Sequence, residues 1–134
     1  MPIAYRDTKE FTAAQLKDLF LSVGWESGKY PDRLQAAMRN CDRVASAWDG
    51  DMLAGLMTGI SDQVMTAYFH YLLVRPEYQD HGIGKKLVEI MLEHYSGCMK
   101  KVLISYNSQI GFYERCGFHA SNESTPMFAA DIKF

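Results

Sequence analysis

Residues 79–84 read Q-D-H-G-I-G, and they join an apolar, strand-like run that ends at Val74 to an amphipathic helix that begins near Lys85. Two glycines, Gly82 and Gly84, let the backbone of this junction approach a ligand closely. The first N–H groups of the helix that follows have no partner within the helix, so they are available to bind an anion. The stretch therefore predicts a phosphate-binding loop between a strand and a helix.

Two lysines strengthen this interpretation. Lys85 and Lys86 lie in the first turn of the predicted helix, where each cation opposes the helix dipole by about 0.3–1 kcal/mol unless an anion offsets it. A plain strand-to-helix turn with glycine for steric reasons and lysine for solubility would look the same, and G-x-G alone does not decide between the two. A dinucleotide-binding loop is excluded because no third glycine follows at the required spacing.

Composition limits the classes of function. The chain has 134 residues, 48% of them hydrophobic, which is enough for a single domain over residues 1–134 with its own core. A net charge of -2 offers no broad basic face for nucleic acid. The N-terminus lacks a signal-peptide pattern, and no uncharged run reaches the roughly 18 residues of a membrane span. We expect a cytoplasmic protein that binds neither nucleic acid nor membrane.

The cysteine pattern indicates neither disulfide bonds nor a metal site. Cys41, Cys98 and Cys116 are odd in number and share no C-x-x-C spacing, which argues against a disulfide framework and against structural zinc. We expect free thiols.

Periodicity and turn signals predict the element order β-α-α-β-β-β-α-β-α-β. Thr12 and Gln15 fit a capping box that starts the first helix. Antiparallel hairpins first and a β-α-β-α segment later indicate an α+β domain with a mixed sheet. The expected strands cover residues 3–6, 43–48, 52–60, 64–74, 102–104 and 127–134, the fifth of them buried. The expected helices cover 12–23, 31–40, a stretch from 85 that Gly97 ends, and 109–116.

Two motifs now carry a family resemblance. V-R-P-E-Y-Q-D-H-G-I-G-K-K-L at residues 74–87 resembles the acetyl-CoA pyrophosphate loop of the GCN5-related N-acetyltransferases (GNAT), usually written Q/R-x-x-G-x-G/A. F-Y-E-R-C-G-F at residues 112–118 resembles that family's second signature. The resemblance implies the acyl-CoA N-acyltransferase fold, acetyl-CoA as co-substrate without a metal, and acetyl transfer to a primary amine of a small molecule or peptide. Homodimers are common in the family, and the sequence leaves the oligomeric state open.

The resemblance also implies which residues hold acetyl-CoA. The backbone of Leu72 and Val74 would pair with the pantetheine arm as an added strand does, and Leu73 between them would also belong to the cofactor-binding stretch. Backbone N–H groups beside Leu72 and Leu73 would stabilise the oxyanion that develops during transfer. The remaining cofactor-binding residues would be Gln79, Asp80, His81, Gly82, Ile83, Gly84, Lys85, Asn107 and Tyr113.

Tyr113 is the residue that the resemblance assigns to proton donation. In related families, including the arylalkylamine N-acetyltransferases, the tyrosine of this motif lies beside the cofactor sulfur and protonates the departing thiolate. A phenol and an alkyl thiol have comparable ordinary pKa values, so this transfer would be nearly balanced. The structural alternative is a buried tyrosine whose hydroxyl bonds a carbonyl. We expect Cys116 to be a small buried thiol and His119 to lie on the surface.

The general base is less clearly marked. His70 lies on the strand before the loop, aligns with a base-bearing histidine of the arylalkylamine branch, and would titrate near neutral pH. Strand alternation predicts Tyr68, His70 and Leu72 on one face. His70 could equally pack as a half-buried histidine between aromatics. Many family members instead use a carboxylate through water, for which the sequence offers Glu26, Asp62 and Glu77.

The acceptor and the competing functions stay open in the sequence. An aromatic pocket for an arylalkylamine could be formed by Trp25, Tyr30, Tyr68 and Tyr71, or these residues could be core. A non-catalytic module that binds or senses acyl-CoA is the main alternative function. A purely structural domain would bind no CoA at all.

Overall fold

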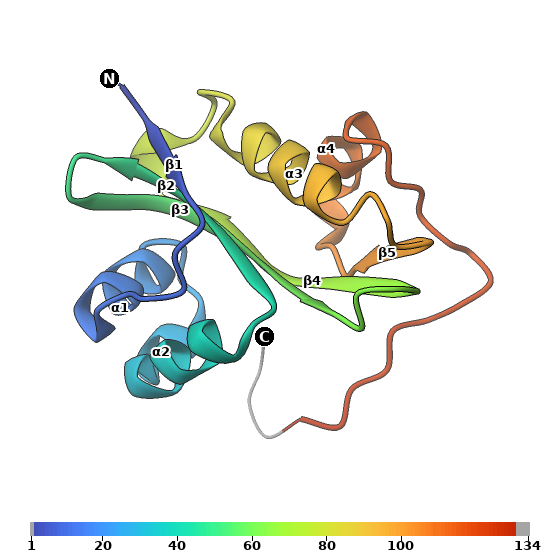
Figure 1. Cartoon of the computed structure of the whole chain (residues 1–134), viewed down its shortest axis with the longest axis horizontal. Coiled ribbons are helices and arrows are strands. Elements are labelled where there is room, and N and C mark those ends of the chain that lie inside the picture. Colours follow the sequence, from blue (N-terminus) through green and yellow to red (C-terminus); the bar gives the residue numbers. More distant parts are fainter. Residues whose placement is uncertain (1, 131–134) are drawn as a thin grey trace.

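The computed structural model describes residues 2–130 and contains a five-stranded mixed sheet (Figure 1). The strands lie in the order β1-β2-β3-β4-β5, and only the β4–β5 pair is parallel. Their bounds are β1 Ala4–Arg6, β2 Arg43–Asp49, β3 Met52–Ser61, β4 Thr66–Val74 and β5 Lys100–Leu103. The predicted α+β fold with a mixed sheet is confirmed.

Helices cover both faces of the sheet (Figure 1). The α-helices are α1 Ala13–Ser22, α2 Pro31–Asn40, α3 Ile83–His94 and α4 Ile110–Arg115, and the short 3-10 helices are η1 Glu26–Lys29, η2 Pro76–Tyr78 and η3 Asn107–Gln109. One core lies between the sheet and α1 with α2, and a second lies between the sheet and α3 with α4. None of the helices within residues 2–130 has the length and apolar character needed to cross a bilayer.

The start of α1 follows from its sequence. The backbone N–H of Gln15 donates to the Thr12 hydroxyl at 3.0 Å, and the Thr12 N–H donates to the Gln15 side chain at 2.9 Å. The predicted capping box is therefore confirmed, and it satisfies two N–H groups at this helix terminus.

β4 contains a β-bulge at His70 and Tyr71. Both residues face the single residue Thr58 of β3, because the pairing register shifts between Met57 and Gly59. The Tyr71 N–H donates to the hydroxyl of the fully buried Thr58 at 3.0 Å, so this side chain replaces a backbone partner. A bulge adds one residue and inverts the alternation of side chains beyond it.

The bulge makes one prediction wrong. Phe69 and Leu72 both pack in the core beside α3, although they are three residues apart, and Tyr71 packs in the core beside α1. Tyr68 and His70, which alternate with Phe69, therefore share the face of Tyr71 and lie opposite Leu72. The expected common face of Tyr68, His70 and Leu72 assumed a strand without a bulge.

β4 and β5 separate after a short parallel pairing. Their register runs from Thr66 with Lys100 to Phe69 with Leu103, where β5 ends. β4 continues to Val74, so within residues 2–130 its last five residues have no strand partner on the β5 side. This divergence opens the sheet at its edge.

β4 also begins later than predicted. The Asp62 carboxylate accepts the backbone N–H groups of Val64, Met65 and Thr66 at 2.9, 2.7 and 3.1 Å. These bonds fold residues 62–65 into a turn, and they lower the pKa of Asp62 because backbone donors favour its charged form.

Two predictions at the C-terminal side differ from the structure. β5 is an edge strand, and its residues are half-buried or exposed; Ile104, expected in a buried strand, lies beyond its end and is 46% exposed. Residues 127–130 of the predicted last strand have no regular structure, and residues 131–134 lie outside the described part.

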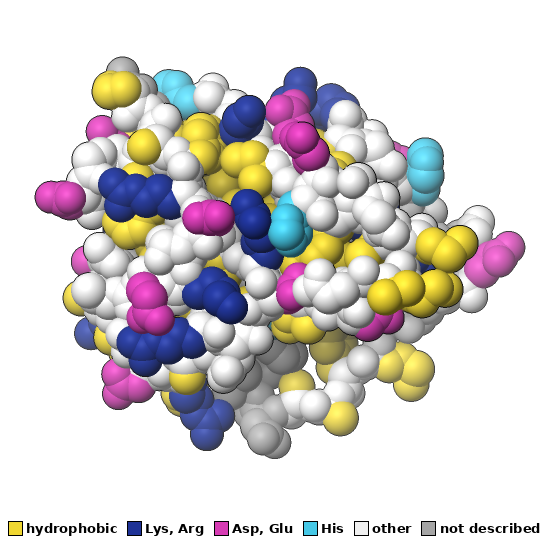
Figure 2. All heavy atoms as spheres, in the orientation of Figure 1, with side chains coloured by type: hydrophobic (Ala, Val, Ile, Leu, Met, Phe, Trp, Pro, Cys, Tyr) yellow, Lys and Arg dark blue, Asp and Glu magenta, His cyan; other side chains and the backbone are white. Residues whose placement is uncertain are grey.

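Figure 2 shows acidic and basic side chains interspersed on the displayed face, without a broad basic field. Hydrophobic side chains gather at its right-hand end, over the β3–β4 turn and the start of β5. Val64, Met65 and Met99 are the large exposed hydrophobic residues of these segments.

Candidate active site

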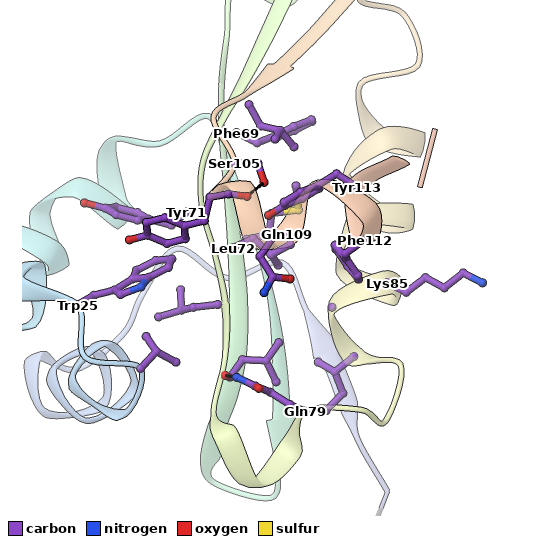
Figure 3. A pocket seen from close by; sticks show the side chains of 18 of the residues that line it. Trp25, Phe69, Tyr71, Leu72, Gln79, Lys85, Ser105, Gln109, Phe112 and Tyr113 are labelled. Atoms are coloured by element: carbon purple, nitrogen blue, oxygen red, sulfur yellow. Dashed lines mark hydrogen bonds between the residues drawn. The ribbon is translucent and has the colours of Figure 1, made fainter. Parts of the chain in front are cut away.

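A cavity of about 430 Å³ lies where β4 and β5 diverge (Figure 3). Its lining comes from both faces of the sheet. The lining residues are Val23 and Trp25 after α1, Met57 on β3, residues 69–74 on β4, residues 78–80 and 82–85 before and at the start of α3, residues 103–106 at and after the end of β5, and Gln109, Phe112 and Tyr113 around α4. Segments far apart in the sequence thus meet at the opening of the sheet.

The N-terminus of α3 forms one end of this cavity. Gly82 is the N-cap residue with φ 78°, a conformation that favours glycine, and no side chain caps the helix. The first turn has no acidic residue, and it carries Lys85 and Lys86. Unpaired N–H groups, a positive dipole end and cations together suit a bound phosphate group. This donor set fits the pyrophosphate of acetyl-CoA.

Hydrogen bonds hold the loop before α3 in place. The Gln79 side-chain amide donates to the Val74 carbonyl at 2.9 Å, and the Tyr78 hydroxyl donates to Asp49 at 2.6 Å. The Val74 carbonyl, expected to pair with the pantetheine arm, thus already has a donor from the loop itself. Asp80 adopts a positive φ of 65°, which helps the loop turn sharply into the helix.

Tyr113 reaches the cavity from α4, and its hydroxyl points toward the cavity centre (Figure 3). Its ring makes edge-on contacts with Phe112 and Phe118 at 5.1 and 6.0 Å between centroids. No residue in the described range 2–130 forms a hydrogen bond with its hydroxyl. Burial, with a smaller contribution from Cys116, raises the pKa of Tyr113 to about 12, so the phenol keeps its proton at neutral pH. The sequence predicts a nearly balanced proton transfer from Tyr113 to the thiolate on the assumption of an ordinary phenol pKa. With its raised pKa, the phenol of the free protein is a weaker acid than this expectation assumed.

His70 lies on the opposite side of the opening from Tyr113, beside Tyr71. Its Nδ1 is 3.0 Å from the Tyr68 hydroxyl, and its ring centroid is 4.2 Å from that of Tyr71. Although its side chain is partly exposed, the surrounding rings remove water from it, and this desolvation lowers the pKa of His70. The imidazole is therefore neutral at pH 7 and able to accept a proton.

The carboxylates considered as alternative bases lie elsewhere. None of Glu26, Asp62 and Glu77 lines the cavity. Asp62 closes the β3–β4 turn, and Glu26 lies 3.8 Å from Lys29. Asp80 is the only Asp or Glu among the described residues that line the cavity.

Most of the predicted site residues line this one cavity, but two do not. His81 is exposed on the loop, and Asn107 is exposed in η3. The three cysteines are free; Cys41 and Cys98 are buried, whereas Cys116 is half-buried. Within residues 2–130, no group of three or more His, Cys, Asp or Glu side chains is arranged to hold a metal ion.

Several residues that line the cavity were not predicted from the sequence. Of the four aromatic residues considered for an acceptor pocket, Trp25 and Tyr71 line the cavity, whereas Tyr30 and Tyr68 do not. The unpredicted lining residues include Tyr78, Ser105, Tyr106 and Gln109. The last three lie after β5 in a stretch without a recognisable motif, and tertiary packing alone brings them to the cavity.

Comparisons with known proteins agree with this geometry. A family model described as an acetyltransferase (GNAT) domain matches residues 41–120. An uncharacterized ycf52-like N-acetyltransferase from Prochlorococcus marinus is 29% identical over 78% of this chain and 61% of its own length. The chloroplastic GCN5-related N-acetyltransferase 2 of Arabidopsis thaliana is 29% identical over 90% of this chain and 55% of its own length. The chain therefore spans between about half and three-fifths of these relatives.

A solved structure shows the same fold. A GNAT-family acetyltransferase from Streptococcus pneumoniae superimposes with a TM-score of 0.83 and 24% identity, covering 98% of this chain and all of that one. At this level of identity the likeness concerns the fold.

Proposed function

Because the chain belongs to the GNAT acetyltransferase family, we propose that it moves an acetyl group from acetyl-CoA to a primary amine of a small molecule or peptide within a ternary complex. One observation carries the proposal. A single cavity at the divergence of β4 and β5 joins the uncapped N-terminus of α3 to Tyr113 on one face of the sheet and to His70 on the other.

The cofactor would lie along the free edge of β4. Backbone groups of Leu72 and Val74 are the candidates for the pantetheine arm, since β5 leaves this edge unpaired. Phosphate groups would bind the loop and first turn of α3 through the backbone N–H groups of residues 80–85, with Lys85 adding charge. The N–H of Gln79 already donates to the Pro76 carbonyl, so Gln79 would contribute by holding the loop through its side chain. His81 and Asn107 would contribute from outside the cavity lining.

Acetyl-CoA would supply an activated acetyl thioester, whose acyl carbon bonds to the amine nitrogen as the bond to sulfur breaks. The amine proton would pass to the neutral imidazole of His70, and the Tyr113 phenol would donate a proton to the sulfur. Backbone N–H groups near Leu72 and Leu73 would stabilise the charge on the acyl oxygen. Holding both reactants in one cavity supplies much of the rate through orientation.

The placement of the acid and the base supports direct transfer. The bulge puts His70 on the same face as Tyr71, whereas Tyr113 packs on the α3 face. An amine that enters beside His70 would therefore meet the thioester from the side opposite Tyr113. Proton removal and proton donation would then occur on opposite sides of the reacting carbon.

A thiol-release assay tests this proposal. The protein is mixed with acetyl-CoA and a panel of primary amines while free thiol is measured, and calorimetry reports acetyl-CoA binding in parallel. Amine-dependent thiol release with formation of the N-acetyl product is expected. Binding without release for any amine would favour the non-catalytic acyl-CoA module, and absent binding would favour a structural domain.

A further inference from the structure

Three aromatic side chains from separate elements meet at the end of the cavity far from the α3 loop. Trp25 comes from the segment after α1, Tyr71 from the β4 bulge, and Tyr106 from the segment after β5. The Trp25 ring centroid lies 6.1 Å from that of Tyr71 and 6.3 Å from that of Tyr106. Figure 3 shows Trp25 and Tyr71 together on one side of β4, across from Tyr113.

The core fixes two of these rings from behind. Fully buried Phe20 makes edge-on contacts with Tyr71 at 5.0 Å and with Trp25 at 6.0 Å. Trp25 and Tyr71 themselves are half-buried and line the cavity, and Tyr106 is 54% exposed. The three rings are therefore not a closed core cluster, because each keeps surface for a ligand.

Charge is distributed unevenly along the cavity. Asp80 and Lys85 belong to the α3 loop, and no other Asp, Glu, Lys or Arg of the described chain lines the cavity. A negatively charged group at the aromatic end would lose water without gaining a cationic partner, which is costly. An ammonium group can instead bind the faces of Trp and Tyr rings, and an aromatic body can pack against them.

From this arrangement we propose that the acceptor is a primary amine attached to an aromatic body without negative charge, and that Trp25, Tyr71 and Tyr106 recognise it. This inference rests on the acetyl transfer proposed above. The close contact of His70 with Tyr71 would place the nitrogen of such an amine beside the proposed base.

Matched acceptors test the substrate class. 2-Phenylethylamine is compared with phenylalanine, which adds a carboxylate, and with butylamine, which lacks the ring. We expect kcat/KM for 2-phenylethylamine to exceed that for phenylalanine and that for butylamine by roughly 10-fold or more. Phenylalanine adds a negative charge without a cationic partner, and butylamine lacks the ring that would contact the aromatic side chains.

Matched variants test the residues. Tyr106→Leu and Trp25→Leu should raise KM for 2-phenylethylamine by roughly 5–30-fold, with acetyl-CoA affinity unchanged. Tyr30→Leu is the control, since Tyr30 is an exposed tyrosine outside the cavity, and it should leave KM unchanged. The exposure of Tyr106 makes its variant informative even if Trp25→Leu folds poorly.

The outcomes separate the two proposals. Equal use of butylamine or phenylalanine, or equal effects of Tyr106→Leu and Tyr30→Leu, would overturn the aromatic acceptor and leave acetyl transfer standing. Binding of acetyl-CoA with transfer to none of the three amines would also overturn it. Absent acetyl-CoA binding would instead refute the proposed function itself.

Discussion

Tyr113 meets the requirements of a general acid in three ways. Its hydroxyl points into the cavity, forms no hydrogen bond within residues 2–130, and carries its proton at neutral pH, with burial raising its pKa further, to about 12. A donor with so high a pKa gives up its proton only when a strong base develops beside it, and a departing thiolate in the same cavity would be such a base. The raised pKa thus favours donation late in the reaction.

Tyr113→Phe tests this role because it keeps the ring and its contacts with Phe112 and Phe118. We expect kcat to fall roughly 10–10³-fold, with little change in acetyl-CoA affinity or in the free energy of unfolding. For the wild type, Tyr113 should cause no alkaline loss near the ordinary tyrosine pKa of about 10. Steady-state kinetics across pH check both statements, and wild-type kcat in the variant would exclude the acid role.

His70 should determine the acidic side of the pH profile. Its lowered pKa keeps the imidazole neutral at pH 7, and activity should fall only as pH drops through a value below about 6.5, where protonation blocks the base. His70→Gln should therefore reduce kcat/KM most at and above pH 7 and should flatten the acidic limb. If the acidic limb of the pH profile is unchanged in His70→Gln, His70 is not the base and serves only in packing.

At the scale of single elements, the bulge in β4 positions His70, the proposed base. It brings His70 and Tyr71 to the same face, where regular alternation would separate them. Thr58 anchors the bulge through its hydroxyl, which accepts the Tyr71 N–H. The geometry of the acceptor side thus depends on one buried side chain of the neighbouring strand.

Thr58→Val should disrupt this anchor. The variant keeps the shape of the side chain but leaves the part-buried Tyr71 N–H without an acceptor, which should cost about 1–3 kcal/mol of unfolding free energy. Denaturant unfolding measures this loss, and Thr58→Ser serves as the matched control because it retains the hydroxyl. Equal stability of Thr58→Val and the wild type would show that another group satisfies the amide.

The bulge also shows why the sequence predicts some features and not others. The α3 loop was predictable because glycines, lysines and the flanking strand and helix all lie within one short segment. The bulge has no local glycine or proline to mark it, and it depends on a cross-strand bond to Thr58. Tyr106 and Gln109 reach the cavity only through the divergence of β4 and β5, which no spacing in the sequence reports.

At the scale of the whole molecule, the sheet separates two tasks. The face beside α3 and α4 carries the loop glycines, Leu72 and Tyr113, whereas the face beside α1 carries Tyr71 and His70. The opening between β4 and β5 joins the two faces at one cavity. The proposed transfer therefore requires acetyl-CoA to enter this opening, with its phosphates at the N-terminus of α3.

Calorimetry of acetyl-CoA binding to the Gly82→Glu variant measures whether the phosphates bind at this helix terminus. The new carboxylate would place negative charge beside the phosphates and force a side chain into a left-handed backbone conformation. Gly50→Glu is the matched control, because Gly50 also has positive φ and open space around it but lies in the β2–β3 turn outside the cavity. We expect Gly82→Glu to lose acetyl-CoA binding while folded, whereas Gly50→Glu should keep wild-type affinity. Unchanged affinity in a folded Gly82→Glu protein would show that the phosphates do not bind at the N-terminus of α3.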